Sequence, residues 1–133
     1  MSLLEGIYAR LAADAGIIAL SAGVYPALAP KESSLPFVVY SQVGGATVSS
    51  LDGANRLQSA RLRFSCYGTA YADAKKLSAA VKSSLNGLAV TLSDGTKVEG
   101  CWLEFETDDS EADLQGTVFA SHVDFNLMFV DVA

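Results

Sequence analysis

Residues with reactive side chains are scarce in this chain of 133 residues, which contains two cysteines, one histidine and one tryptophan. A zinc site needs about four nitrogen or sulfur ligands, and His122 with the widely separated Cys66 and Cys101 does not form a recognisable set. Each cysteine alternates with apolar neighbours, so we expect two reduced thiols in the core. A disulfide or a reactive thiol is the alternative.

Long apolar runs are also missing. No run approaches the ~18 residues that a membrane span requires, yet half of the residues are apolar, which is too many for a disordered chain. The opening residues carry Glu5 and lack a basic segment before an apolar block. We therefore expect that the chain has no secretory signal and is made in the cytoplasm. The length predicts one soluble domain over residues 1–133.

Basic residues are absent after Lys97. The chain up to Lys97 holds nine bases and six acids, a charge of +3, whereas residues 98–133 hold nine acids and no base, a charge of −9. Such a segment repels a phosphate backbone, so we expect no sequence-specific binding of nucleic acid. A solvated acidic loop at 107–116 is the simpler interpretation. Six of the acids lie close together: Glu104, Glu106, Asp108, Asp109, Glu111 and Asp113.

Sequence motifs for catalysis or cofactors are lacking too. The stretch RFSCYGTAYADAKKL predicts a strand, a turn at Gly68 and a helix, but neither G-x-G-x-x-G nor G-x-x-x-x-G-K-[ST] is present. Nothing in the sequence places His122 near Cys66 as a base for a nucleophile. An EF-hand alignment of the acidic segment puts Leu114 where glycine is required. We therefore expect a structural corner, with no catalytic residue, cofactor or metal.

Two charged pairs remain. Glu104 and Glu106 are expected on one strand face with Trp102, which leaves an acid/base enzyme as a minor alternative. Arg61 and Arg63 share a face of another strand. If the two strands are neighbours, the pairs form salt bridges within one subunit. If they are not, a positive patch on one copy could meet the negative segment of the next, and such head-to-tail contacts close into rings.

Hydrophobic periodicity predicts an α+β fold: a mostly antiparallel sheet with two α-helices packed on one face. We expect Ser2 and Glu5 to cap the first helix, Thr69 to cap the second, and Asn86-Gly87 to end it. Asp94-Gly95 predicts a hairpin turn. The predicted elements are a helix over 3–14, a mostly irregular stretch over 16–36, a strand over 36–43, a loop or two extended arms over 44–55, strands over 56–67, 88–92, 97–106 and 117–132, and a helix over 70–85.

Several segments together resemble a known family. They are IYARLAADAGI, GVYPALAP, LPFVVYSQVGG, ARLRFSCYGTAYADAKKLSAAVKSSLNG and the closing HVDFNLMF. In this order and spacing they resemble the tail completion proteins of tailed bacteriophages and prophages, which are related in fold to tail terminators. The resemblance runs from about Leu3 to Phe129 and depends most on the strand entry at 36–40 and the turn and helix at 67–85.

The resemblance implies a structural virion protein rather than an enzyme. It would form a ring, hexameric in relatives, on the head-proximal end of the tail tube, where it stops tube growth and helps join the tail to the head. Its implied partners are further copies of itself, the major tail tube protein and a head completion or connector protein, with DNA passing through the lumen and no membrane. It would be made in the host cytoplasm and reside at the head–tail junction of the virion.

We accordingly expect Arg56, Arg61 and Arg63 to contact the acids between Glu104 and Asp113 of an adjacent subunit, and the 44–55 loop to reach a tail or head partner. Two other classes remain open: a stand-alone ligand-binding or adaptor domain, and, less favoured, a small enzyme. A ligand in an apolar cleft near Trp102 would favour either of these.

Overall fold

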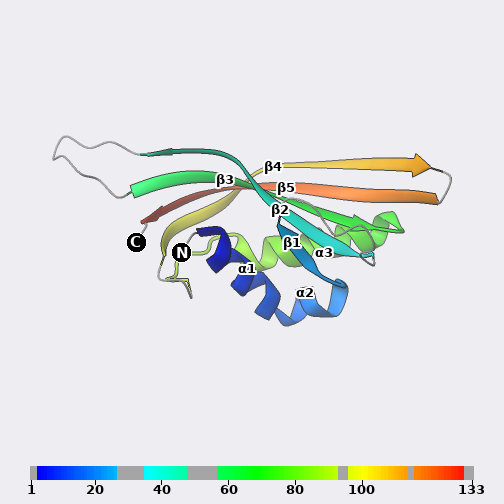
Figure 1. Ribbon diagram of the computed structural model, residues 1–133, viewed down its shortest axis with the longest axis horizontal. Coiled ribbons are helices and arrows are strands. Elements are labelled where there is room, and N and C mark those ends of the chain that lie inside the picture. The colour runs from blue at the N-terminus through cyan, green and yellow to red at the C-terminus, as the bar shows by residue number, and fades with distance from the viewer. Residues whose placement is uncertain (1–2, 27–34, 48–56, 93–95, 114–115, 131–133) are drawn as a thin grey trace.

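A sheet and a layer of helices make up the part of the chain that the computed structural model describes, which is residues 3–26, 35–47, 57–92, 96–113 and 116–130 (Figure 1). The helices all lie on one face of the sheet. The described elements are α1 (Leu3–Ala13), α2 (Ala15–Leu20), β1 (Val24–Pro26), β2 (Phe37–Thr47), β3 (Leu57–Gly68), α3 (Tyr71–Leu85), β4 (Lys97–Asp113) and β5 (Gly116–Val130).

The strand order is β1-β2-β3-β5-β4, so β5 lies between β3 and β4. Every neighbouring pair is antiparallel except β1 with β2, which is parallel. Leu62 of β3, Phe125 of β5 and Leu103 of β4 lie side by side across the sheet. The predicted α+β class and mostly antiparallel sheet are confirmed, with α2 and β1 in addition to the predicted elements.

The core lies between the sheet and the helices. Side chains alternate along β3, and four of them face the helices: Ala60, Leu62, Phe64 and Cys66 are all 2% exposed or less. The stripe of α3 packs against it through Ala74, Leu77, Val81 and Leu85. Burying one such large aliphatic or aromatic side chain stabilises the fold by about 1.5–3 kcal/mol.

The stretch after α1 is more ordered than we expected. The first helix ends at Ala13, close to the prediction, although Ser2 lies outside the described residues. The Asp14 carboxylate then accepts hydrogen bonds from the backbone N–H groups of Gly16 (2.9 Å) and Ile17 (3.1 Å) and so caps α2. The mostly irregular assignment is therefore wrong here, because a side-chain cap and the edge of β2 organise α2 and β1.

The two ends of α3 differ in how well the sequence predicted them. Ala70, not Thr69, is the N-cap residue, and among the described contacts no side chain caps this end. Asn86 is the C-cap residue, and Gly87 follows with φ +80°. This left-handed conformation suits glycine because it has no Cβ. The predicted stop is confirmed and the predicted N-cap is wrong.

The segment 88–92 does not form the predicted strand. Within the described residues it contributes one isolated bridge, between Thr91 and Lys97. Leu88 and Leu92 are buried but Val90 is 39% exposed, so the spacing of buried side chains is not that of a regular strand. The predicted turn at residues 94–95 lies outside the described residues.

The acidic segment is not a loop. Residues 107–113 continue β4, and β5 pairs with them up to the pair Asp113 and Gly116. The polar stretch after residue 43 likewise begins as strand, since β2 pairs with β3 up to Thr47 and Gln58. These extended arms agree with one of the two predicted alternatives, and residues 48–56 lie outside the described part.

The two long hairpins project at opposite ends of the molecule. The described end of the β2–β3 pair lies at the left in Figure 1, and the end of the β4–β5 pair lies at the right, beyond the middle of the sheet that the helices cover. None of the helices in the described ranges is long and apolar enough to cross a membrane.

Candidate functional site

Two arginines and one aspartate form a cluster on the outer face, as we call the face of the sheet opposite the helices. Arg63 donates from Nε to Asp124 Oδ1 (2.8 Å) and from a terminal nitrogen to Oδ2 (3.1 Å), and Arg61 donates to the same Oδ2 (3.0 Å). The Asp124 side chain is 1% exposed, whereas the two arginine side chains are 45% and 43% exposed. One buried carboxylate therefore holds two half-exposed cations.

The ionisation of Asp124 reflects two opposing effects. Burial is the largest single cause and raises the pKa. The hydrogen bonds and charges of Arg63 and Arg61 lower it, and together they outweigh burial, so the pKa of this carboxyl lies below its ordinary value. The hydrogen bond to Asp124 in turn raises the pKa of Arg63. The cluster is fully ionised at neutral pH and carries a net charge of +1.

The alternative in which Arg61 and Arg63 pair with Glu104 and Glu106 within one subunit is wrong. These arginines do make cross-strand ion pairs, but with Asp124 on β5, because β4 is not a neighbour of β3. Asp124 was not among the predicted contact residues, because its role depends on β5 lying beside β3 with Asp124 opposite Arg63. The sequence of a single segment does not reveal that pairing.

Glu104 and Glu106 lie on opposite faces of the sheet, contrary to our expectation. The pairing of β4 with β5 shifts register between Leu103 and Phe105, and such a bulge changes which residues point to each face. Glu104 accepts a hydrogen bond from Asn126 (3.1 Å) on the outer face. Glu106 instead faces α3, so the two carboxylates do not form the acid/base pair considered above.

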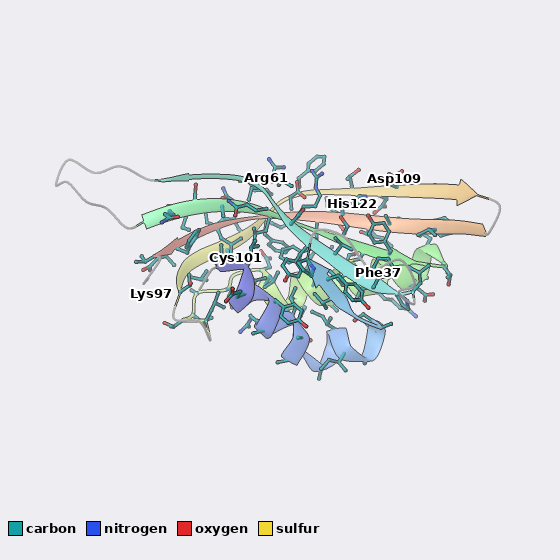
Figure 2. The ribbon with its side chains drawn as sticks, in the orientation of Figure 1. Phe37, Arg61, Lys97, Cys101, Asp109 and His122 are labelled. Atoms are coloured by element: carbon teal, nitrogen blue, oxygen red, sulfur yellow. The ribbon has the colours of Figure 1, made fainter. Side chains whose placement is uncertain are left out.

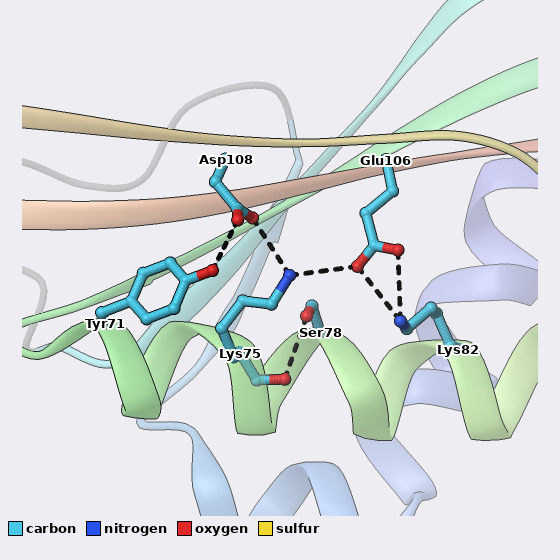
Figure 3. Close-up of polar contacts among 6 residues, drawn as sticks. All are labelled: Tyr71, Lys75, Ser78, Lys82, Glu106 and Asp108. Atoms are coloured by element: carbon cyan, nitrogen blue, oxygen red, sulfur yellow. Dashed lines mark hydrogen bonds and ion pairs between the residues drawn. The ribbon is translucent and has the colours of Figure 1, made fainter.

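A second cluster joins β4 to α3 on the inner, helix-bearing face (Figure 3). Glu106 accepts from Lys82 (3.1 and 3.3 Å) and from Lys75 (3.2 Å). Lys75 also donates to Asp108 (3.1 Å), and the Tyr71 hydroxyl donates to the same carboxylate (2.7 Å). Two lysines and a tyrosine of the helix thus fasten the base of the β4–β5 hairpin. Sequence patterns did not indicate this contact, because it depends on α3 lying beneath β4.

The pKa shifts in this cluster follow the hydrogen bonds. The bond from Lys82 is the largest cause that lowers the pKa of Glu106, and the bond from Tyr71 is the largest that lowers the pKa of Asp108. The pKa of Tyr71 is raised, chiefly by its bond to Asp108. Both carboxylates are therefore ionised at neutral pH, and the cluster acts as an electrostatic clamp.

The residues considered for nucleophilic chemistry are kept apart. Cys66 is fully buried on the inner face, and burial raises the pKa of its thiol to about 12. His122 lies on the outer face, where its Nδ1 is 2.7 Å from the hydroxyl of Ser65 (Figure 2). Cys101 is also a buried free thiol, with a pKa raised by burial to about 12. The expectation of two free core cysteines is confirmed.

The remaining predicted contact residues are placed as follows. Asp109 is exposed on β4, and one of its carboxylate oxygens accepts from the N–H of Ser110 (2.8 Å). Glu111 and Asp113 belong to β4, with side chains outside the described set. Arg56 lies outside the described residues. Figure 2 shows Arg61 toward the β2–β3 end and Asp109 toward the β4–β5 end.

No group of His, Cys, Asp and Glu side chains that could hold a metal ion is found within the described ranges. An open groove of about 480 Å³ lies beside Trp102 and is lined by Glu99, Gly100 and Met128. Among the described residues that line this groove, Glu99 is the one carboxylate beside Trp102. An acid/base pair of carboxylates is therefore not found there within the described residues. This site corresponds to the cleft on which a ligand-binding alternative would depend.

Comparison with known proteins identifies the family. The model of the family described as "Tail completion protein gp17" matches residues 5–129. A chain in the solved structure of the virion of a native gene transfer agent particle has a similar fold, with a TM-score of 0.75 and 22% identity over 98% of this chain and 96% of that chain. Comparison with curated proteins found no match. Because the family model covers nearly the whole chain, this protein belongs to the tail completion protein gp17 family.

Proposed function

We propose that this protein forms a ring on the head-proximal end of a phage tail tube, where it ends tube growth and offers the head connector a docking surface. Family membership supports a structural role in the tail. The fold shared with a chain of a gene transfer agent virion is consistent with that role. In this proposal the protein is part of the virion and catalyses no reaction.

The observation that carries the ring is the separation of charge along the molecule. The outer cluster of Arg61, Arg63 and Asp124 has a net charge of +1 and lies near the middle of β3 and β5, whereas the acidic part of β4 extends toward the β4–β5 end, where Figure 2 labels Asp109. A positive cluster and an acidic strand that lie apart on one chain favour a head-to-tail contact, and such contacts close into a ring when the rotation between copies allows it. We propose six copies, as the family resemblance implies.

The acidic segment also suits a channel through which DNA passes. Residues 98–133 carry nine acids and no base. Glu106, Asp108 and Asp124 are paired with lysines or arginines of other elements, and the exposed acids of β4 such as Asp109 would repel the phosphates of DNA. The major tail tube protein and a head completion protein are the proposed partners on the two sides of the ring.

Native mass spectrometry of the full chain, alone and then with tail tubes from the phage or prophage that encodes it, tests this proposal. We expect a discrete hexamer, either free or bound to one end of the tube. The charge reversal Arg61→Glu with Arg63→Glu should abolish the ring, and Lys76→Glu on α3 should leave it intact. A protein that remains monomeric and never joins the tube would refute the proposal.

A further inference from the structure

The edge of β2 is open along more than half of its length in the described part of the chain. β1 pairs with Val38–Tyr40, and Ser41–Thr47 then continues without a described neighbour on that side. These seven residues span about 23 Å. Within the described residues no strand pairs with the backbone groups on this edge, although the Gly44 carbonyl accepts a hydrogen bond from the Gln42 side chain (3.2 Å). Such an edge can pair with another strand.

The edge of β4 is covered in its first half and open in its second. Val98 donates its N–H to the carbonyl of Val90 (2.8 Å), and Leu103 donates its N–H to the side-chain oxygen of Asn86 (3.3 Å). From Glu104 to Asp113, no described strand lies along this edge. The bulge beside Glu104 marks the change from the covered to the open part.

We propose that the open edge of β4 in one copy pairs with the open edge of β2 in the next copy, an inference that rests on the ring proposed above. The directions of the strands permit this pairing. β2, β3, β5 and β4 alternate in direction, so β4 of a copy related by rotation about a ring axis that runs roughly along the strands is antiparallel to β2. The two open segments lie toward opposite ends of their strands, because Ser41 is level with Phe105 across the sheet. Pairing them therefore requires neighbouring copies to be offset along the strand direction, which strands tilted relative to the ring axis provide. The projecting hairpins, which lie at opposite ends of one molecule (Figure 1), would then overlap from copy to copy.

Charge complementarity favours this occupant of the edge. The open segment of β2 has the sequence SQVGGAT, which carries no charge, and Arg61 and Arg63 lie on the next strand. A β4 strand added beside β2 lies two strand spacings, about 10 Å, from β3. The side chains of Asp109 on that strand and of Arg61 or Arg63 on β3 are together long enough to bridge this distance on the outer face. The symmetric alternative, β4 against β4, would instead oppose acids to acids, which is destabilising.

Cysteine pairs test the contact directly. Ser41 pairs with Arg63 and therefore lies on the outer face, as do Thr107 and Asp109 by their register with His122 and Ala120. In one chain β2 and β4 are separated by three strand spacings, about 14 Å, which is too far for a disulfide. Ser41→Cys combined with Thr107→Cys or Asp109→Cys should thus give cross-linked oligomers between copies on mild oxidation.

Matched controls distinguish strand pairing from mere proximity. Gln42 is adjacent to Ser41 but pairs with the inward-facing Leu62, so Gln42→Cys with the same β4 cysteines should give little product. Asp109→Cys alone should give no dimer, because a dimer from this single variant would indicate pairing of β4 with β4 and would overturn the inference. The native thiols are buried and should not react.

Hydrogen exchange supplies a measurement that does not depend on the register. On ring assembly, the backbone amides in 41–47 and 104–113 should exchange at least about tenfold more slowly than in the free protein. Rings that form without this protection and without the Ser41 cross-links would overturn the edge pairing and leave the proposed function standing. If no ring forms, alone or on tail tubes, both proposals fail together.

Discussion

The carboxylate of Asp124 holds two arginines on the outer face, so its removal should destabilise the protein. The change Asp124→Asn keeps the size of the side chain but removes its charge and the acceptor that Arg63 shares with Arg61. Removing one partner of a fully buried ion pair costs about 3–5 kcal/mol. Here both arginine side chains are more than 40% exposed and can be rehydrated, so the cost should be smaller.

We expect Asp124→Asn to lower the free energy of unfolding by about 2 kcal/mol, the value of one to two charged hydrogen bonds. For a chain of this length that corresponds to a decrease in Tm of roughly 6–10 °C. Urea unfolding followed by circular dichroism measures the difference. Asp109→Asn is the matched control, because this acid is exposed on the adjacent strand, and it should change stability by less than about 0.5 kcal/mol.

The difference between native protein and Asp124→Asn should depend on pH in a defined way. The folded pKa of Asp124 is lowered, so its ionised form contributes stability that is fully present above the unfolded pKa of about 3.9. The contribution is lost as pH falls through the folded pKa. The two proteins should therefore differ by a constant amount from pH 7 to pH 5 and converge below about pH 4. A difference that is negligible at pH 7, or that grows on acidification, would refute the reasoning.

Three further changes test other parts of the structure. Glu106→Gln removes the charge between two lysines of α3 and should cost about 0.5–1 kcal/mol at low salt and nearly nothing in 1 M NaCl; a loss independent of salt would contradict the clamp. Gly87→Ala forces a side chain into φ +80° in open space and should cost about 1 kcal/mol in urea unfolding, with no loss counting against a left-handed cap. Cys66 and Cys101 should resist a thiol reagent at pH 8, because a pKa of about 12 leaves about one thiol in ten thousand ionised; labelling of the folded protein as fast as in urea would show that they are accessible.

The sequence predicted correctly those helices and strands that are determined by their own local pattern of residues. Alternation of apolar residues placed β3 and β5, and the apolar stripe at helical spacing placed α3, because a side chain's face follows directly from these periods. Gly87 marked the end of α3 for a local reason as well. The same logic failed at residues 107–113, where acids that suggest a loop are held in a strand by pairing with β5 and by Lys75 and Tyr71 of α3.

The candidate site depended on information that single segments do not carry. Arg61 and Arg63 were correctly identified as a charged pair on one face, but their partner depends on β5 lying between β3 and β4. Glu104 and Glu106 were assigned to one face because a regular strand has a period of two, and a bulge breaks that period. Strand order and bulges arise from tertiary packing, which explains why Arg61, Arg63 and Glu106 were found but their partners were not.

Polymerisation of tail tube protein in the presence of this protein, viewed by electron microscopy, tests the central claim most directly. We predict tubes that carry one added ring at a single end and that stop growing from that end, with Arg61→Glu, Arg63→Glu protein leaving tubes uncapped. Tubes that grow equally long with and without the native protein, and that carry no additional ring at either end, would contradict the account.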